Sequence, residues 1–473
     1  TDRRFDTESV EEITRNFPHW FHPRFRLFSG REQKLPVDQN SLMALIAPRG
    51  LMLSSAITEG QGNPWAIGKA YQSVKTVYDF LGADDQIAIN LRGGRHATAA
   101  RDIEDFIDFF DFIFGRTTMK PENKLFYDYT YAGWMEKSGE SPADVPLFDL
   151  DKRGKEDIQD RMQCLLGKEP AGIFNNSEKT WANRKSEDDY LGDVIGQPNW
   201  DGMKNMLIRP YNSMGDYLWA NLYLPANVQI AGDSITGNYP LIVFLHEYSY
   251  PTGYRRRVAP ILRELTDRGF AVLAFDMIGF GTRIEESMNF YKRYPHWSLM
   301  GKMVADARNI IHDASSGLSF IDQENIFLAG YALGGTVALF TAALDDRIKG
   351  VAVAGAVTSF RNPDPATEGN RHFSHLHGLL PRLGLFEGNE SDIPVDFDDI
   401  LSCVQPIPTL VIAPMQDRHH PRGQVERIVN AAVNSSGAGP DDNTILFVQP
   451  DTYDQFSPDM IRTMADWLKE QSE

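Results

Sequence analysis

Three residues of this chain have the types and settings that acyl-transfer chemistry uses. His96 lies in a glycine-rich loop, GGRH at 93–96, and Glu59 and Asp417 each come a few residues after an apolar run. A histidine whose ring is oriented by a carboxylate can take a proton from a serine hydroxyl and so make it a nucleophile. These residues therefore indicate serine-type hydrolysis, which also requires a suitably placed serine.

A glycine-flanked turn stands where that serine would be expected. The apolar run 326–329 leads into GYALGG at 330–335, and an apolar helix is predicted over 336–344. The pattern Gly-x-Ser-x-Gly raises a serine hydroxyl above a sheet on a tight strand-to-helix turn. Here Ala332 occupies the apex, and a methyl group neither attacks a carbonyl nor loses a proton. Ala332 is either an engineered Ser→Ala substitution or a natural loss of the nucleophile.

The elements around this turn alternate between buried strands and helices. Strands are predicted over 241–246, 271–275, 326–329, 350–353, 409–413 and 444–448, and helices over 257–268, 300–315, 336–344 and a stretch ending near 468. Such alternation is typical of the α/β class with a doubly wound, mostly parallel sheet. Together with the glycine turn, it predicts an α/β-hydrolase fold for this part of the chain.

The composition limits the kinds of partner. The 473 residues are more than one ordinary domain holds, so two units are expected. The net charge of −18 argues against nucleic acid or a membrane surface as a partner, and no transmembrane span is predicted. Cys164 and Cys403 are too few for a disulfide framework or a zinc cluster, and no metal or cofactor is expected. Because the sequence begins at Thr1, we expect a processed or trimmed product.

The chain also repeats itself. At a shift of 358 positions, Pro36-Val37-Asp38 meets Pro394-Val395-Asp396, and the matches continue at His19 and His377, Pro23 and Pro381, Gly30 and Gly388, and Pro48 and Pro406. Glu59 falls on Asp417 at the same shift, and reducing the shift to 357 pairs His96 with Tyr453. An ordered series of this length indicates a duplication.

The repeat predicts the domain organisation. Residues 1–116 correspond to 358–473, so they form the C-terminal third of a first hydrolase unit, followed by a linker at 117–150 and a second, near-complete unit at 151–473. The first unit's nucleophile would lie about 26 residues before Thr1, because its counterpart is Ala332. We therefore expect an upstream segment or a separate chain to complete the first unit, since a small piece of parallel sheet exposes apolar edges.

The repeat also bears on the second unit's chemistry. Ala332, Asp417 and Tyr453 occupy its triad positions, and two of the three have lost the required side chain. Two losses favour natural inactivity over a single engineered substitution. Asp417 is then a vestige or a loop-structuring acceptor. His419 or His420 as a displaced base is a minor alternative, because Ala332 would still offer no nucleophile.

Three further groups have both a functional and a structural interpretation. His372, His375 and His377 suggest zinc, but their spacing fits no common motif, so a structural role is favoured. The segment His246-Glu247-Tyr248 stands where this fold places its oxyanion loop. The nearby aromatic residues either stack on sugar rings or pack against the sheet, and packing is favoured; they are Tyr248, Tyr250, Tyr254 and Trp297.

Several phrases of residues 1–116 resemble the C-terminal third of bacterial glucuronoyl esterases, a family of carbohydrate esterases. They are FPHWFHPRF, LPVDQNSLMALIAPR, GGRHAT and DFFDF. The resemblance implies a Ser-His-Glu/Asp triad that cleaves esters of 4-O-methylglucuronic acid on xylan, and a secreted or periplasmic location. It makes His96 the base and Glu59 a candidate acid, with Asn63 where many relatives carry Asp.

Residues from about 150 to 473 resemble acetyl-xylan esterases and dienelactone hydrolases, in the phrases FLHEYSYPTGY, FDMIGFGTR and HWSLMGKMVAD. Two hypotheses about function follow. The first is a glucuronoyl-esterase-like carbohydrate esterase that acts on glucuronoxylan and carries a degenerate second module. The second is a non-catalytic carbohydrate-binding or scaffolding protein.

Overall fold

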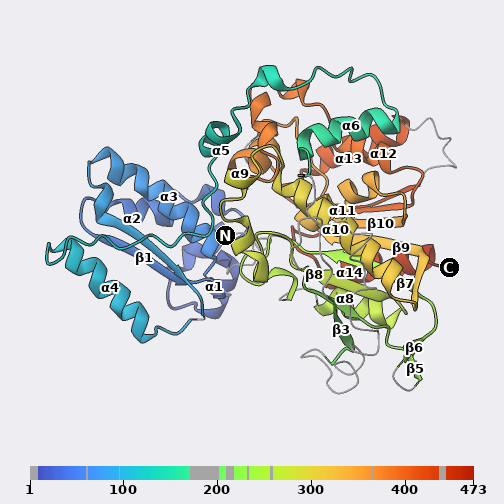
Figure 1. The fold of residues 1–473 in the computed structure, drawn as a ribbon, viewed down its shortest axis with the longest axis horizontal. Coiled ribbons are helices and arrows are strands. Elements are labelled where there is room, and N and C mark those ends of the chain that lie inside the picture. Colours follow the sequence, from blue (N-terminus) through green and yellow to red (C-terminus); the bar gives the residue numbers. More distant parts are fainter. Residues whose placement is uncertain are drawn as a thin grey trace. The chain divides into compact units, whose positions relative to one another are not determined.

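The computed structural model describes residues 9–59, 62–94, 96–170, 202–208, 218–231, 234–255, 259–364, 367–435 and 444–473. These residues form two compact units. Unit 1 comprises 1–128 with the short segments 249–252 and 279–288, and unit 2 comprises 129–248, 253–278 and 289–473. Each unit is described by itself, and Figure 1 labels the elements.

Unit 1 is built on two parallel strands. Strand β1 (Leu51–Ala56) pairs with β2 (Ile87–Arg92), and Leu51 lies opposite Ile87. The helices of this unit are α1 (Val10–Asn16), α2 (Gln39–Ala44), α3 (Pro64–Phe80) and α4 (Ala100–Ile113). Tyr71, Val74 and Tyr78 recur along one face of α3 and pack with apolar residues of both strands, which forms a small core.

Unit 2 contains an eight-stranded sheet in the order β12-β11-β10-β9-β7-β8-β4-β3. Its strands are β3 (Asn205–Ile208), β4 (Ala220–Tyr223), β7 (Tyr239–Leu245), β8 (Ala271–Phe275), β9 (Ile321–Tyr331), β10 (Ile348–Ala354), β11 (Thr409–Ile412) and β12 (Ile445–Val448). Strand β4 is antiparallel to both of its neighbours, β3 and β8, and the remaining neighbours are parallel. A separate hairpin joins β5 (Gln229–Ala231) and β6 (Ser234–Thr236).

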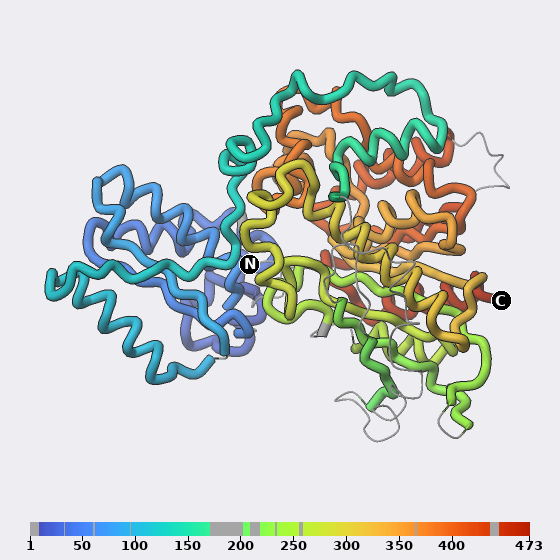
Figure 2. The backbone as a smooth tube through the Cα atoms, in the orientation of Figure 1, coloured from blue at the N-terminus to red at the C-terminus, as the bar shows by residue number. Residues whose placement is uncertain are grey.

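Helices cover both faces of the unit 2 sheet. Helices α10 (Leu299–Gly317), α11 (Leu333–Leu344), α12 (Phe397–Val404), α13 (Arg422–Ser435) and α6 (Lys155–Leu166) form one layer, and α8 (Ala259–Asp267) and α14 (Pro458–Gln471) pack together in the other. Two short helices, α5 (Tyr131–Ser138) and α9 (Phe290–Arg293), also contact each other. The layers can be followed in Figures 1 and 2. The predicted doubly wound, mostly parallel sheet is confirmed.

The stretch 117–150, predicted to be a linker, contains helix α5 and backbone hydrogen bonds to β2. Lys124 exchanges backbone hydrogen bonds with Ile89 and Leu91, so it adds to the open side of β2 within unit 1. Further along, Thr130 caps helix α5, whose Trp134 donates a hydrogen bond to the carbonyl oxygen of Pro295 within unit 2. This stretch is therefore divided between the units and packed into each.

The repeat extends through the secondary structure. Elements of unit 1 recur 358 positions later in unit 2: α2 and α12 begin at 39 and 397, β1 and β11 at 51 and 409, α3 and α13 at 64 and 422, β2 and β12 at 87 and 445, and α4 and α14 at 100 and 458. Local bonds recur as well, since Gly30 donates to Glu32 Oε1 and Gly388 to Glu390 Oε1, at 3.1 and 2.9 Å. The predicted reduction of the shift to 357 was wrong. In both copies of the repeat, the last helix begins 13 residues after the start of the last strand, so the shift remains 358.

The two copies of the repeat differ in how far one apolar face of their last helix, α4 or α14, is buried. Ile103, Ile107, Phe110 and Phe114 follow one another at helical spacing, and 43–65% of each remains exposed. The counterparts of the first three in α14 are Ile461, Ala465 and Leu468, and each is at most 4% exposed. Helix α14 packs against α8 and β10. The corresponding face of α4 lacks that cover among the described residues, and there β1 pairs with β2 alone.

The matched positions Phe110 and Leu468 give a stability prediction. Phe110→Ala is expected to lower the free energy of unfolding of this chain by less than about 1 kcal/mol, because a half-exposed ring leaves no cavity. Leu468→Ala is expected to cost about 2–5 kcal/mol, because Leu468 is fully buried. Urea denaturation of both variants tests this, and equal losses would mean that the α4 face is covered in solution.

Candidate active site

The structure brings together His96 and Glu59, two of the residues singled out in the sequence. Glu59 follows β1, His96 follows β2, and Nδ1 of His96 is hydrogen-bonded to Oε1 of Glu59. The histidine side chain is 86% exposed and the carboxylate 15% exposed. Since the carboxylate holds Nδ1, the other ring nitrogen, Nε2, is available to a reacting group, as a general base requires.

The loop that carries His96 is fastened at several points. Arg92 forms an ion pair with Asp102 at 2.6 Å and donates to the carbonyl oxygen of Ala97 at 2.8 Å. Arg101 donates to the carbonyl oxygen of Gly93 at 2.7 Å, and the Thr58 hydroxyl donates to that of Gly94. These bonds connect the loop after β2 to α4 and to the segment that carries Glu59, and so they limit where the imidazole can lie.

Asn63, at the alternative acid position, has a different role. Its Oδ1 accepts a hydrogen bond from the backbone N–H of Ala66 at 3.2 Å and so caps α3. Glu59, and not Asn63, is therefore the residue hydrogen-bonded to His96. No hydroxyl or thiol lies within hydrogen-bond distance of His96 in the part of the chain that the structure describes.

In unit 2, the turn at 330–335 has the geometry that a nucleophile position needs. Ala332 joins β9 to α11 with φ 49° and ψ −121°, a conformation that L residues rarely adopt. A Cβ on Gly334 would collide with the Leu245 carbonyl, and one on Gly335 with Cβ of Ala356. The glycines thus permit close approach of helix and sheet, and the residue held at the apex is a fully buried alanine.

A buried charged cluster lies beyond the ends of strands β10 and β11. Asp417 Oδ1 accepts from the backbone N–H groups of His419 and His420 at 2.8 and 3.1 Å, so it structures this loop. Its Oδ2 lies 2.9 Å from Nδ1 of His420, and Nε2 of His420 lies 3.2 Å from Oε2 of Glu368. His420 and Glu368 are each at most 1% exposed.

The two carboxylates determine the charge of His420. Burial disfavours the imidazolium, but the carboxylates of Asp417 and Glu368 outweigh it and raise the pKa of His420 to about 9. At neutral pH His420 is therefore protonated, with Nδ1 hydrogen-bonded to Asp417 and Nε2 in an ion pair with Glu368. A protonated imidazole cannot act as a general base. The sequence singled out Asp417 but gave no sign of Glu368, which lies 52 positions before His420.

The residue at the position of His96 in unit 2 is Asp454 rather than Tyr453. The shift stays at 358 from β2 to α4, and it pairs residue 96 with residue 454. Tyr453 is 62% exposed, and Asp454 lies 3.8 Å from Nε2 of His419. Unit 2 therefore has no histidine at the position of His96, whichever of the two residues is aligned with it.

His372 and His377 both contact Tyr248, whereas His375 contacts Ser374. Nε2 of His372 lies 3.3 Å from the Tyr248 hydroxyl, His377 packs on the Tyr248 ring, and Nδ1 of His375 contacts the Ser374 hydroxyl at 2.8 Å. No group of metal-ligating residues with suitable geometry is found in the described ranges.

The loop after β7 and its aromatic residues are also buried. His246 Nε2 accepts from the backbone N–H of Met277 at 3.1 Å, and Nδ1 donates to the Glu247 carbonyl oxygen. The aromatic side chains considered for sugar stacking are at most 5% exposed, so they pack inside the protein; they are Tyr248, Tyr250, Tyr254 and Trp297.

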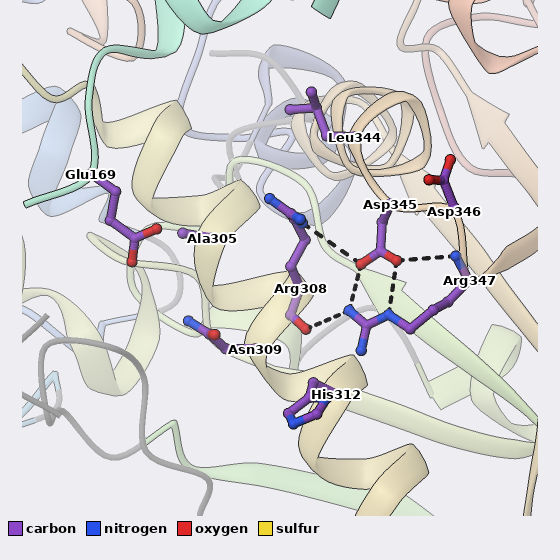
Figure 3. A pocket seen from close by; sticks show the side chains of 9 residues that line it. All are labelled: Glu169, Ala305, Arg308, Asn309, His312, Leu344, Asp345, Asp346 and Arg347. Atoms are coloured by element: carbon purple, nitrogen blue, oxygen red, sulfur yellow. Dashed lines mark hydrogen bonds and ion pairs between the residues drawn. The ribbon is translucent and has the colours of Figure 1, made fainter. Parts of the chain in front are cut away.

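Two cavities of similar size lie at opposite ends of the unit 2 sheet. One, of about 480 Å³, is lined by residues of α10 and of the turn before β10, at the amino end of that strand. Figure 3 shows Asp345 between two arginines: it binds Arg347 through two bonds of 2.8 and 2.5 Å and lies 3.7 Å from Arg308. The other, of about 490 Å³, lies between the segments that follow β10 and β11, at the carboxyl ends where ligands of open α/β sheets bind.

Two family models match parts of the chain. The model described as "Glucuronyl esterase, fungi" matches residues 2–82, and the model described as "Serine aminopeptidase, S33" matches residues 241–396. The first match includes Glu59, and the second includes the elbow at Ala332. In the described part of the chain, no helix is both long and apolar enough to span a bilayer.

Two curated relatives are carbohydrate-active or esterase proteins by name. The chain is 36% identical over 124 residues to "Carbohydrate esterase MZ0003" from an unknown prokaryotic organism, which covers 23% of this chain and 28% of the relative. It is 33% identical over 130 residues to "Multidomain esterase" from Ruminococcus flavefaciens, which covers 27% and 16% respectively. The chain thus spans less than a third of the length of either relative.

The fold of the chain also has solved counterparts. A glucuronoyl esterase from Solibacter usitatus superposes with a TM-score of 0.51 at 14% identity, over 69% of this chain and 95% of that one. At this identity the likeness concerns the fold. Sequence, fold and site geometry agree: the chain has the α/β-hydrolase fold and resembles glucuronoyl esterases, most clearly over residues 2–82.

Proposed function

We propose that this chain supplies the general base and its carboxylate to a carbohydrate esterase of the glucuronoyl type. The observation that carries the proposal is the hydrogen bond between His96 and Glu59 at the ends of two adjacent parallel strands. In serine esterases a carboxylate orients the imidazole, which then removes the proton of the nucleophile. His96 is the proposed base and Glu59 the acid that orients it.

In this proposal the nucleophile comes from a polypeptide segment that unit 1 lacks. Its equivalent in unit 2 is the segment that precedes residues 358–473. That segment contains α8, β10 and the elbow, the elements that cover α14 and pair with β11. Among the described residues, α4 has an exposed apolar face where α14 is covered by α8, and β1 has an open edge where β11 pairs with β10. An added strand and helix would bury both and would place a serine beside His96.

The relatives support a proposal for the substrate class. Esters of uronic acids on plant cell-wall glucuronoxylan are the proposed natural substrates, because residues 2–82 match the glucuronyl esterase model. The direct test is hydrolysis of a benzyl glucuronate ester by the full-length gene product. Hydrolysis that depends on His96 supports the proposal, and no hydrolysis of this ester by folded full-length protein overturns it.

We also infer that unit 2 has no hydrolase activity of its own. Ala332 supplies no nucleophile, and His420, the histidine bonded to the acid Asp417, is protonated and bound to Glu368. Both losses are present in one module, which supports natural inactivity. The Ser→Ala change alone would not have altered the partner of His420.

Ala332→Ser is therefore expected to leave unit 2 inactive. The new hydroxyl would have no neutral histidine to take its proton, because the pKa of His420 is raised to about 9. p-Nitrophenyl acetate hydrolysis should stay at the rate of the His96→Ala background in the double variant His96→Ala/Ala332→Ser. A clear gain from this serine would show an engineered knockout with a working base.

A further inference from the structure

The cavity at the carboxyl end of the unit 2 sheet is built by two segments of the repeat region. Ser359, Arg361, Asn362 and Pro363 come from the segment after β10. Pro421, Gly423, Gln424 and Arg427 come from the start of α13, a helix of 14 residues. Its volume of about 490 Å³ falls within the range that small-molecule sites occupy.

The charge of this lining is unusual for the protein. Two arginines and no carboxylate line the cavity, although the whole chain has a net charge of −18. Arg361 is held by the Ile393 carbonyl oxygen at 2.9 Å and lies 3.6 Å from Asp399. Arg427 is exposed and has no ion-pair partner among the described residues, whereas its neighbour Arg422 pairs with Glu426 at 2.9 Å. A free guanidinium and a helix N-terminus both favour an anion.

A second observation indicates a ligand that also carries hydroxyl groups. Gln424 lines the cavity and is only 9% exposed, and its Oε1 accepts no hydrogen bond in the described structure. Buried amide oxygens without a donor are rare in folded proteins. The last side-chain torsion of glutamine is broad, so Oε1 can turn toward a donor in the cavity. Asn362 and Ser359 add further polar groups to the same lining.

We propose that unit 2 binds an acidic oligosaccharide in this cavity without turnover, with the uronic-acid carboxylate at Arg427 and sugar hydroxyls at Gln424 and Asn362. The anionic and hydroxylated character comes from the lining itself. The choice of a saccharide rests on the proposed function. Unit 2 would then hold a chain of the same polymer on which unit 1 acts.

Calorimetric titration of the folded 473-residue chain tests this with three probes. They are a glucuronic-acid-substituted xylo-oligosaccharide, the matching unsubstituted xylo-oligosaccharide and inorganic phosphate. We expect the acidic oligosaccharide to bind, the neutral one to bind at least about tenfold more weakly, and phosphate not to compete at equal concentration. Arg427→Ala should weaken binding about tenfold, and Gln424→Leu should also weaken it.

Arg422→Ala is the matched control, because Arg422 begins the same helix but does not line the cavity. It should leave the affinity unchanged. The proposal is overturned if the acidic oligosaccharide does not bind, if the neutral one binds equally, if Arg427→Ala binds like the parent, or if phosphate displaces the sugar and reveals a simple anion site. These binding results do not depend on ester hydrolysis, so each proposal can fail without the other.

Discussion

Replacing His96 by alanine is expected to lower kcat for a benzyl glucuronate ester by about 10⁴-fold or more in the full-length gene product. The loss is large because, in the proposed mechanism, His96 takes the proton of the nucleophile, and triad members act as a unit. Nδ1 of His96 is bonded to Glu59, so the proposed general base and its proposed orienting acid lie together in unit 1. Steady-state kinetics of the purified variants measure the effect.

Two further variants distinguish catalysis from stability. Glu59→Gln keeps the size of the side chain but removes the charge that fixes the imidazole, and we expect kcat to fall by about 10²-fold or more. His19→Ala removes an exposed histidine of the same unit and should leave kcat unchanged. Activity retained in His96→Ala, or lost equally in His19→Ala, would contradict the assignment of the base.

The second large effect concerns the stability of unit 2 at high pH. The pKa of His420 rises from its ordinary value of 6.5 to about 9 on folding, because Asp417 and Glu368 flank a buried imidazole. A group with a raised folded pKa stabilises the protein fully below its unfolded pKa, and this stabilisation is lost as the pH rises through the folded value. We therefore expect unit 2 to lose about 3 kcal/mol between pH 6.5 and pH 9.5 through this group.

Urea denaturation at the two pH values measures this loss, with His420→Gln as the reference. Other groups titrate in the same range, including Lys69 in unit 1, whose pKa burial lowers to about 8. The effects of these other groups cancel when the change in the free energy of unfolding of His420→Gln with pH is subtracted from that of the parent. His420→Gln should be less stable than the parent at pH 6.5 and closer to it at pH 9.5. A parent and a variant with parallel pH profiles would show that His420 is not protonated in the folded state.

Much of the fold was predictable from the pattern of apolar residues and from the glycines at turns. The runs at 241–246 and 271–275 are continuously apolar because both faces of those strands are covered, and they lie within or close to β7 and β8. The glycines of the turn at 330–335 are needed where helix and sheet backbones touch, so the elbow was visible in the sequence. Strands β3 and β4 were missed, because strands of only four residues carry little periodic signal.

The site was predictable where it depends on position in the repeat. His96 and Glu59 lie at the ends of neighbouring parallel strands, and such ends meet in any sheet of this kind. Glu368 and Gln424 could not be found in this way, since their importance arises from contacts between loops distant in sequence and from a missing hydrogen-bond donor. The alignment slip at Tyr453 arose from a chance match of Asp85 with Asp442.

The central claim is that hydrolysis belongs to the unit with His96 and not to the unit with Ala332. Labelling the full-length gene product with a fluorophosphonate probe, followed by peptide mass mapping, tests it most directly, because such probes bond only to activated serines. The account predicts a label on a serine outside unit 2, and loss of that label in His96→Ala. A label on a serine within 129–248, 253–278 or 289–473, or one unaffected by His96→Ala, would contradict it.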